Sequence, residues 1–189
     1  MKKIPTFPEP SDFDERVRKP GQAFLSSLDG TPLSHDFRGH SYWSRAHNQL
    51  HRLYAGICAY SSAWTPLPLP VNADNGHSSV DHFMPKTESP NVAYEWSNFR
   101  LARAYVNQAK GNSTDISDPT SVCDEWFQIN FKTFRVITQN QSLRGGLRPT
   151  LTLINSRRLV DERANVIQTY IKGGACVVVR GREVSVYSF

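Results

Sequence analysis

One segment of this 189-residue chain, Ser-Val-Asp-His-Phe-Met-Pro-Lys at residues 79–86, limits what the chain can fold into more than any other. Asp81 stands directly before His82, and two asparagines follow, Asn98 and Asn107. Carboxylate and amide oxygens are ligands that a hard divalent cation accepts. An imidazole, whose unperturbed pKa lies near neutrality, can take a proton from water. Together these groups are what metal-dependent hydrolysis of a phosphodiester requires, so we expect them to converge in the fold.

The residues around these positions predict a strand, a loop, a second strand and a helix. Residues 78–83 combine β-branched and aromatic side chains, and residues 99–110 change from a strand pattern to helix-forming residues. Gly111 and Asn112 are suited to end that helix. The interval 85–95 is rich in proline and polar residues, which is typical of a loop. Neighbouring strand residues point to opposite faces, so the adjacent aspartate and histidine need a bend in the chain to act together.

This pattern resembles that of the HNH nucleases, which share a ββα-metal fold. The similar subgroup carries Asp-His-Phe-x-Pro-Lys, Tyr-x-Trp-x-Asn-Leu and Asn-x-x-Lys-Gly. This sequence has Asp-His-Phe-Met-Pro-Lys, Tyr-Glu-Trp-Ser-Asn-Phe and Asn-Gln-Ala-Lys-Gly, and the likeness extends over roughly residues 40–171. The resemblance implies that His82 is the general base and that Asp81 and Asn107 bind the metal. It also implies that Asn98 fixes the backbone and the orientation of the loop that carries His82.

Related chains commonly carry two cysteine pairs near this site, which together bind a structural zinc. Here Cys58 remains, while Ser61, Arg103 and Val106 stand at the other three places. A structural zinc site needs four ligands. We therefore expect no structural zinc in this chain. Packing is expected to hold the module together instead, through Tyr60, Trp64, Phe99, Tyr105 and Val106.

Basic side chains near the motif are the expected contacts to nucleic-acid phosphates, namely Lys86, Arg100, Arg103 and Lys110. An ordinary solvated position is an equal alternative for each of them. The chain has 22 Lys and Arg against 17 Asp and Glu, a net charge of +5 and a pI near 9.2. Such a balance suits a polyanionic partner without requiring one. His47 and His51 lie one helical turn apart, and we interpret them as part of an exposed helix face rather than a metal site.

The fold class predicted is α+β, a ββα-metal HNH core with surrounding helices. Residues 1–40 are expected to form a proline-rich extended arm, up to residue 20, and a short helix. Residues 41–171 form the nuclease domain, with its catalytic core at about 57–112 and helices at its C-terminal end, and residues 172–189 form a terminal hairpin. The remaining expected elements are helices at 21–28 and 42–55, a helical pair within 149–171, strands at 58–64 and within 126–137, a long connection at 66–76, and hairpin strands at 175–179 and 183–187.

The cysteines and the hydropathy pattern indicate where such a chain would work. Three cysteines, Cys58, Cys123 and Cys176, are too few for a disulfide framework, which indicates a reducing cytoplasm. No apolar run is long enough for a secretory signal or a membrane span, so we expect no membrane partner.

The function expected is an HNH endonuclease that hydrolyses phosphodiester bonds in DNA with one Mg²⁺ or Mn²⁺ ion. Chains that resemble this one often form the nuclease half of bacterial anti-phage systems, beside a separate ATPase partner, and this chain has no P-loop of its own. One ion and one base cut one strand per encounter, so double-strand cleavage needs a homo-oligomer or two sequential nicks. Two alternatives stay open. One is a catalytically degenerate HNH fold that binds nucleic acid or a partner protein, and the other is cleavage of RNA.

Overall fold

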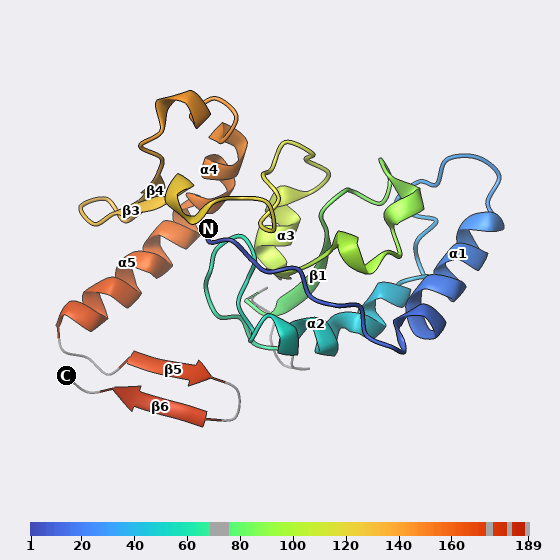
Figure 1. Ribbon diagram of the computed structural model, residues 1–189, viewed down its shortest axis with the longest axis horizontal. Helices are drawn as coiled ribbons and strands as arrows, with labels where there is room; N and C mark the ends of the chain where they lie inside the picture. Colours follow the sequence, from blue (N-terminus) through green and yellow to red (C-terminus); the bar gives the residue numbers. More distant parts are fainter. Residues whose placement is uncertain (69–75, 173–175, 181–182, 188–189) are drawn as a thin grey trace.

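The computed structural model describes residues 1–68 and 76–172, together with the backbone of two strands at 176–180 and 183–187. The expected α+β class is confirmed, because helices and three small two-stranded antiparallel sheets alternate along the described part of the chain (Figure 1). Most of the expected long connection at 66–76 lies outside the described residues. No helix in the described part of the chain is both long enough and apolar enough to cross a bilayer.

The N-terminal third is an extended arm followed by helices. The arm lies on the body of the molecule (Figure 1): the Ile4 amide donates to the Pro119 carbonyl at 2.8 Å, and the Trp96 indole donates to the Phe7 carbonyl at 2.9 Å. The arm is shorter than expected, because a π-helical turn already begins at Asp14. Successive helical elements here are the π-helical turn Asp14–Arg18, α1 Lys19–Ser26, the 3-10 turn Tyr42–Ala46 and α2 His47–Leu53.

The centre of the molecule contains the predicted strand, loop, strand and helix. Strand β1, Ser78–His82, pairs antiparallel with β2, Phe99–Arg103, and α3, Ala104–Lys110, follows β2 without a linker. The register places Ser78 opposite Arg103 and His82 opposite Phe99. Gly111 ends the helix with a φ of 53°, a conformation that glycine adopts without strain.

The strand expected at 58–64 is wrong. Only an isolated bridge joins Ile57 to Trp64, and the residues between them form a tight turn. The Cys58 amide donates to the Ala63 carbonyl at 2.9 Å, and the Ser62 amide donates back to the Cys58 carbonyl at 3.0 Å. Ser62 takes a positive φ of 57° in closing this turn. Cys58, Ala59 and Tyr60 are buried from this turn, whereas Trp64, which was expected to pack in the module, is 43% exposed.

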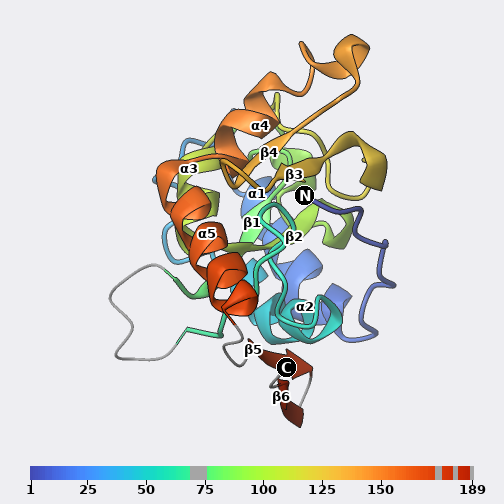
Figure 2. The same cartoon turned by 90° about the vertical axis from the view of Figure 1, so that its left-hand side faces the viewer.

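The C-terminal half confirms the expected helical pair and hairpins. A short hairpin, β3 Gln128–Asn130 with β4 Arg135–Ile137, precedes α4 Arg148–Ile154 and α5 Arg157–Ile171. Helix α5 runs along the edge of the molecule toward the last hairpin (Figures 1 and 2). That hairpin consists of β5 Cys176–Arg180 and β6 Glu183–Tyr187.

An aromatic core lies between the N-terminal helices and the β1–β2 hairpin. The Phe13 ring meets the rings of Trp96 and Phe99 edge-on, at centroid distances of 5.5 and 5.7 Å. Phe24 and Tyr94 extend the cluster, with centroids 6.4 Å apart. Buried aromatic side chains contribute large apolar areas to stability. This core therefore fixes the hairpin on which Asp81 and His82 are carried.

Candidate functional site

Asp81 is enclosed by two polar partners on one side of β1. Its carboxylate accepts a hydrogen bond from the Tyr60 hydroxyl at 2.5 Å and lies 3.2 Å from the Lys110 ammonium. The ammonium, which comes from the last residue of α3, also donates to the carbonyl oxygen of His82 at 2.8 Å. Tyr60 is fully buried, Asp81 is 2% exposed and the Lys110 side chain is 0% exposed. The charges of this ion pair are therefore removed from water.

Burial also governs the ionisation of this group. Burial raises the pKa of the Asp81 carboxyl above its usual value, and Lys110 and the Tyr60 hydroxyl act in the opposite direction. Burial raises the pKa of Tyr60 well above its usual range, and the neighbouring carboxylate adds to that shift. Tyr60 therefore keeps its proton and serves as a donor to Asp81.

His82 lies on the other side of β1, among aromatic rings, because the two residues stay in regular strand register and β1 does not make the bend that would bring both side chains to one face. Its ring meets Trp43 edge-on with centroids 4.8 Å apart, and Phe99 edge-on at 5.3 Å. Its Nε2 lies 2.9 Å from the carbonyl oxygen of Ala93. A carbonyl can only accept, so Nε2 carries the hydrogen and Nδ1 of the neutral ring carries the lone pair. Burial, followed by the positive charge of Lys86, lowers the pKa of His82 to about 3.

The consequence is an imidazole that is neutral and fixed in one tautomer at physiological pH. Within the described residues no protein group bonds Nδ1, and the residue retains 9% exposure. A neutral ring nitrogen with a free lone pair can accept a proton from water or from a substrate hydroxyl. The arrangement around His82 thus orients a neutral nitrogen, and the low pKa makes this nitrogen a weak base in the resting structure.

The side chain of Asn98 forms hydrogen bonds with both ends of the loop that connects β1 and β2. Its Oδ1 accepts from the Met84 amide at 2.8 Å, and its Nδ2 donates to the carbonyls of Met84 at 3.0 Å and Val92 at 3.1 Å. The Phe83 amide donates to the Asn98 carbonyl at 2.9 Å. Val92 directly precedes Ala93, whose carbonyl holds His82. The amide of Asn98 therefore restrains both ends of the loop that orients the base.

Asn107 lies on α3, and its side chain contacts the two residues of β1 that directly precede Asp81. Its Nδ2 donates to Ser79 Oγ at 3.1 Å and to the Val80 carbonyl at 3.2 Å. One turn later on the same helix, Lys110 reaches Asp81 and the His82 carbonyl. Helix α3 is thus attached to β1 along its length. The nitrogen of the Asn107 amide is used in this attachment, whereas its oxygen is the group that a metal would need.

Two observations bear on whether a divalent ion fits here. The oxygens of Asp81 and Asn107 have the chemistry that Mg²⁺ and Mn²⁺ prefer, and Asp81 already attracts a cation, the Lys110 ammonium. Among the described residues there is no group of three or more His, Cys, Asp and Glu that could hold a metal. The two side chains therefore carry oxygens of the kind that a hard cation accepts, and the cation that Asp81 contacts in this structure is the Lys110 ammonium.

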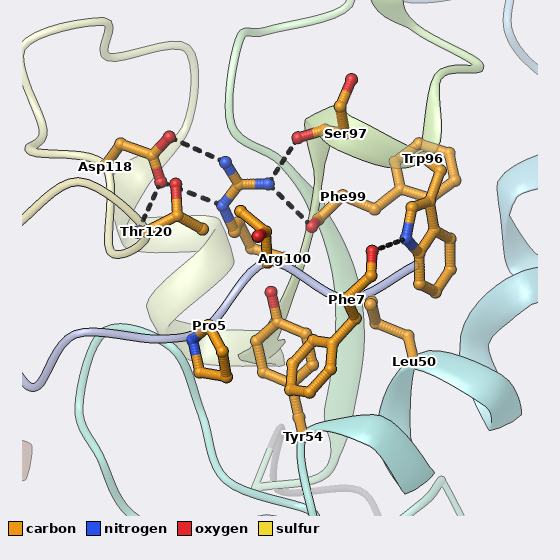
Figure 3. Close-up of a pocket in the computed structure, with 11 residues that line it drawn as sticks. Pro5, Phe7, Leu50, Tyr54, Trp96, Ser97, Phe99, Arg100, Asp118 and Thr120 are labelled. Carbon is orange, nitrogen blue, oxygen red and sulfur yellow. Dashed lines mark hydrogen bonds and ion pairs between the residues drawn. The ribbon is translucent and has the colours of Figure 1, made fainter. Parts of the chain in front are cut away.

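Arg100 lies at β2 beside a pocket of about 300 Å³ beneath the N-terminal arm (Figure 3). Its guanidinium donates to both carboxylate oxygens of Asp118, at 3.1 and 2.8 Å, and to the carbonyls of Ser97 and Phe99. The side chain is 7% exposed. Arg100 therefore binds protein oxygens on all sides, and its role in this arrangement is to hold the segment around Asp118 against β2.

Two more of the residues expected to contact phosphates form ion pairs within the chain. Lys110 pairs with Asp81, and Arg103 pairs with Glu162 of α5 and donates to the Trp64 carbonyl. Lys86 is different, because its ammonium lies over the rings of Phe37 and Trp43, 5.5 and 5.4 Å from their centroids. Of the four basic residues proposed from the sequence, Lys86 is the one whose charge has no carboxylate partner in the described part of the chain.

The position of the absent cysteines is filled by polar and apolar contacts. The Cys58 thiol is buried, and its sulfur accepts from the Arg103 amide at 3.4 Å. Val106 is 1% exposed. The Arg103 and Glu162 pair, joined by the Tyr105 hydroxyl at 3.0 Å from Glu162, connects α5 to this region. An ion pair and buried side chains therefore join the segments here.

Sequence reasoning missed Tyr60, Asp118 and Glu162 as partners of site residues, and it assigned Lys110 to nucleic acid instead of to Asp81. For Lys110 a signal exists. It follows Asn107 by one helical turn, so any packing that brings Asn107 to β1 brings Lys110 there as well. No local signal identifies the other three, because each comes from a segment distant in sequence.

Neither known protein families nor curated proteins show a match to this chain. We therefore infer the function of this chain from its residues and their geometry.

Proposed function

We propose that this chain is a metal-dependent HNH endonuclease that hydrolyses phosphodiester bonds in DNA. The observation that carries the proposal is the orientation of His82. The Ala93 carbonyl fixes its tautomer, and the amide of Asn98 restrains the loop that supplies this carbonyl. The order of β1, β2 and α3 supports the assignment, since a ββα-metal core has the same order of elements.

His82 would act as the general base. Nδ1 would take the proton of the attacking water, while the Nε2 hydrogen bond to Ala93 strengthens as the ring becomes positive. Asn98 would keep this nitrogen in place without touching the reacting atoms. The rings of Trp43 and Phe99 exclude water from the rest of the imidazole, so that one nitrogen alone is available.

Asp81 and Asn107 would hold one Mg²⁺ or Mn²⁺ ion. Such an ion, when bound, supplies positive charge to the phosphoryl and leaving oxygens. Tyr60 would orient the carboxylate of Asp81 by donating to it. Lys86, whose ammonium has no carboxylate partner among the described residues, would contact a phosphate of the substrate.

The setting we propose is anti-phage defence in the bacterial cytoplasm. The chain would act as the nuclease beside a separate ATPase that recognises the target, either as single copies that nick one strand or as a homo-oligomer. The net charge of +5 supports a nucleic-acid partner. RNA cleavage remains an outcome of the test below, because a base and a metal act on either sugar.

One observation favours a second candidate. The carboxylate of Asp81 is buried and paired with Lys110, as in a purely structural ion pair. A catalytically degenerate HNH fold that binds nucleic acid or a partner protein would keep such a pair permanently. The two candidates differ in whether the purified chain cuts.

Incubation with supercoiled plasmid, single-stranded DNA and RNA, each with Mg²⁺, Mn²⁺ or EDTA, tests the proposal. We expect metal-dependent cutting of DNA. In His82→Ala the cleavage rate should fall by a factor on the order of 10² to 10⁴. His35→Ala is the matched control, because the His35 side chain is 64% exposed and contacts its neighbour Asp36. Cutting by His82→Ala at the unchanged rate excludes this base. Binding without cutting of any substrate supports the degenerate fold.

A further inference from the structure

The buried pair of Asp81 and Lys110 occupies the place where the proposed function needs a free carboxylate. The ammonium contacts two oxygens, those of the Asp81 side chain at 3.2 Å and the His82 carbonyl at 2.8 Å. Both side chains are almost completely removed from water. A cation held by a carboxylate and a carbonyl oxygen occupies a small cation site made of hard oxygens.

A divalent ion and this ammonium would not share Asp81 readily. Two cations on one carboxylate would lie within a few ångströms of each other, and repulsion at that separation is strong where water is excluded. The carboxylate has no second free oxygen either, because Tyr60 donates to the one that faces away from Lys110. Binding of a metal at Asp81 therefore requires the ammonium to leave.

The structure contains space for that movement. An open cavity of about 480 Å³ borders Lys110 between α3 and α4. Its walls carry apolar side chains, hydroxyl groups from Ser113, Thr152 and Ser156, and the guanidinium of Arg148, and no acidic side chain lines it. A lysine side chain has rotatable bonds and a strongly hydrated ammonium, so a cavity open to water next to its stem can receive it, provided that water keeps the ammonium apart from the like charge of Arg148.

We propose that Lys110 is an internal cation that competes with a divalent metal ion for Asp81. This inference rests on the proposed nuclease function, in which Asp81 is a metal ligand. In the resting chain the ammonium neutralises the carboxylate and keeps the buried charge paired. The metal binds when Lys110 withdraws toward the cavity between α3 and α4, so the chain's own lysine sets its metal affinity.

Titration with Mn²⁺, followed by calorimetry or by the paramagnetic resonance of the free ion, tests the proposal without any cleavage assay. We expect Lys110→Met to bind Mn²⁺ about tenfold more tightly than the native chain or better, because no ion pair has to be broken. Lys110→Arg keeps the cation and should bind as weakly as the native chain. Lys132→Met removes the same charge from an exposed position and is the matched control, with unchanged affinity expected.

The variant itself provides a second measurement. Without metal, Lys110→Met leaves a buried carboxylate unpaired and should melt at a lower temperature than the native chain. Excess Mn²⁺ should restore the lost stability, with a larger upward shift in melting temperature than it gives the native chain. Adding Asp81→Asn to Lys110→Met should remove both the tighter binding and the larger shift.

Three results would overturn the proposal. If Lys110→Met binds Mn²⁺ no more tightly than the native chain, Lys110 does not compete with the metal and only positions Asp81. A gain in affinity that survives Asp81→Asn would place the metal elsewhere. Lys110→Met that stays unfolded even with excess Mn²⁺ would mean that a metal cannot replace the ammonium. None of these results affects the plasmid assay with His82→Ala, so failure of the competition and failure of the nuclease proposal are distinguishable.

Discussion

Asp81 and His82 are neighbours in β1, and both are buried, but their side chains meet different surroundings on the two sides of the strand. On one side, Asp81 meets a hydroxyl and an ammonium, which compensate a charge with hydrogen bonds. On the other side, His82 meets two aromatic rings and a carbonyl, which favour a neutral ring. Burial disfavours the charged form of both groups, so the pKa of the carboxyl rises and that of the imidazole falls. The polar side has the partners needed to hold a charge, and the aromatic side keeps a base unprotonated.

The largest expected effect is on the cleavage rate, and it distinguishes the role of Asn98, beside His82, from that of Asn107, beside Asp81. Asn98→Ala removes the restraint on the His82 loop, and a base misplaced by about 1 Å can lose on the order of 10²-fold in cleavage. Its Mn²⁺ affinity should stay close to native. Asn107→Ala removes a proposed metal ligand, so it should weaken Mn²⁺ binding and recover part of its cleavage at high Mn²⁺.

Metal titration and cleavage rates of both variants provide the measurement, with the exposed Asn91→Ala as control. If Asn98→Ala loses the metal while Asn107→Ala keeps it, the two roles are exchanged. If both variants keep the metal and cut normally, the HNH assignment fails.

The next effect concerns the polar side alone. Tyr60→Phe removes the hydroxyl that donates to Asp81 and leaves the ring in place. A hydrogen bond to a charged group contributes about 1.5–3 kcal/mol, so the free energy of unfolding should fall by that amount. Urea unfolding measures it. Tyr42→Phe is the control, since among the described residues the Tyr42 hydroxyl bonds the ring of His40, at 3.2 Å, and no carboxylate. Equal losses of unfolding free energy in the two variants would show that the hydrogen bond from Tyr60 to Asp81 stabilises the fold no more than an ordinary hydroxyl contact does.

The sequence predicted the local elements of this site and missed how its charges pair. Strands β1 and β2 and helix α3 are encoded by short-range preferences, which is why their order and bounds were close to the structure. The segment 58–64 was wrong because its apolar residues fit a strand or a buried turn equally well. A positive φ at Ser62 settled the choice, and serine gives no signal for it.

The basic residues show the same limit in another form. Arg100 and Arg103 are close to the motif in sequence, yet their carboxylate partners, Asp118 and Glu162, come from later segments that tertiary packing brings to β2. A lysine or arginine in a sequence reveals its charge and not its partner. Three of the four basic residues expected to contact phosphates, Arg100, Arg103 and Lys110, thus have carboxylate partners inside the chain.

A smaller effect should appear in the pH dependence of stability. His82, with a folded pKa of about 3, and His47, with about 4, both titrate below the unfolded value near 6.5. Between these values the unfolded chain binds more protons, so stability is fully present above about pH 6.5 and is lost as the pH falls. Asp81 acts with the opposite sign, because its folded pKa is raised and protonation favours the folded state.

Urea unfolding at pH 7 and pH 5 measures this difference. His82 alone should cost roughly 2 kcal/mol over that interval. His82→Gln, which does not titrate, should show a correspondingly smaller loss, while His35→Gln on the surface should behave as the native chain does. Equal losses in all three proteins would mean that His82 is not neutral in the folded state.

The smallest effect tests what keeps the base unprotonated. Burial is the larger cause of the low His82 pKa and the charge of Lys86 is the second, and Lys86 itself rests on the Trp43 ring. Trp43→Leu opens the aromatic side and removes that support, so the His82 pKa should rise from about 3 toward its ordinary value. Lys86→Met removes the charge alone and should raise the pKa less. NMR titration of the ring protons measures both variants, with Trp126→Leu as a control away from the ring. A larger rise in Lys86→Met than in Trp43→Leu would mean that charge repulsion, and not exclusion of water by the rings, sets the state of this base.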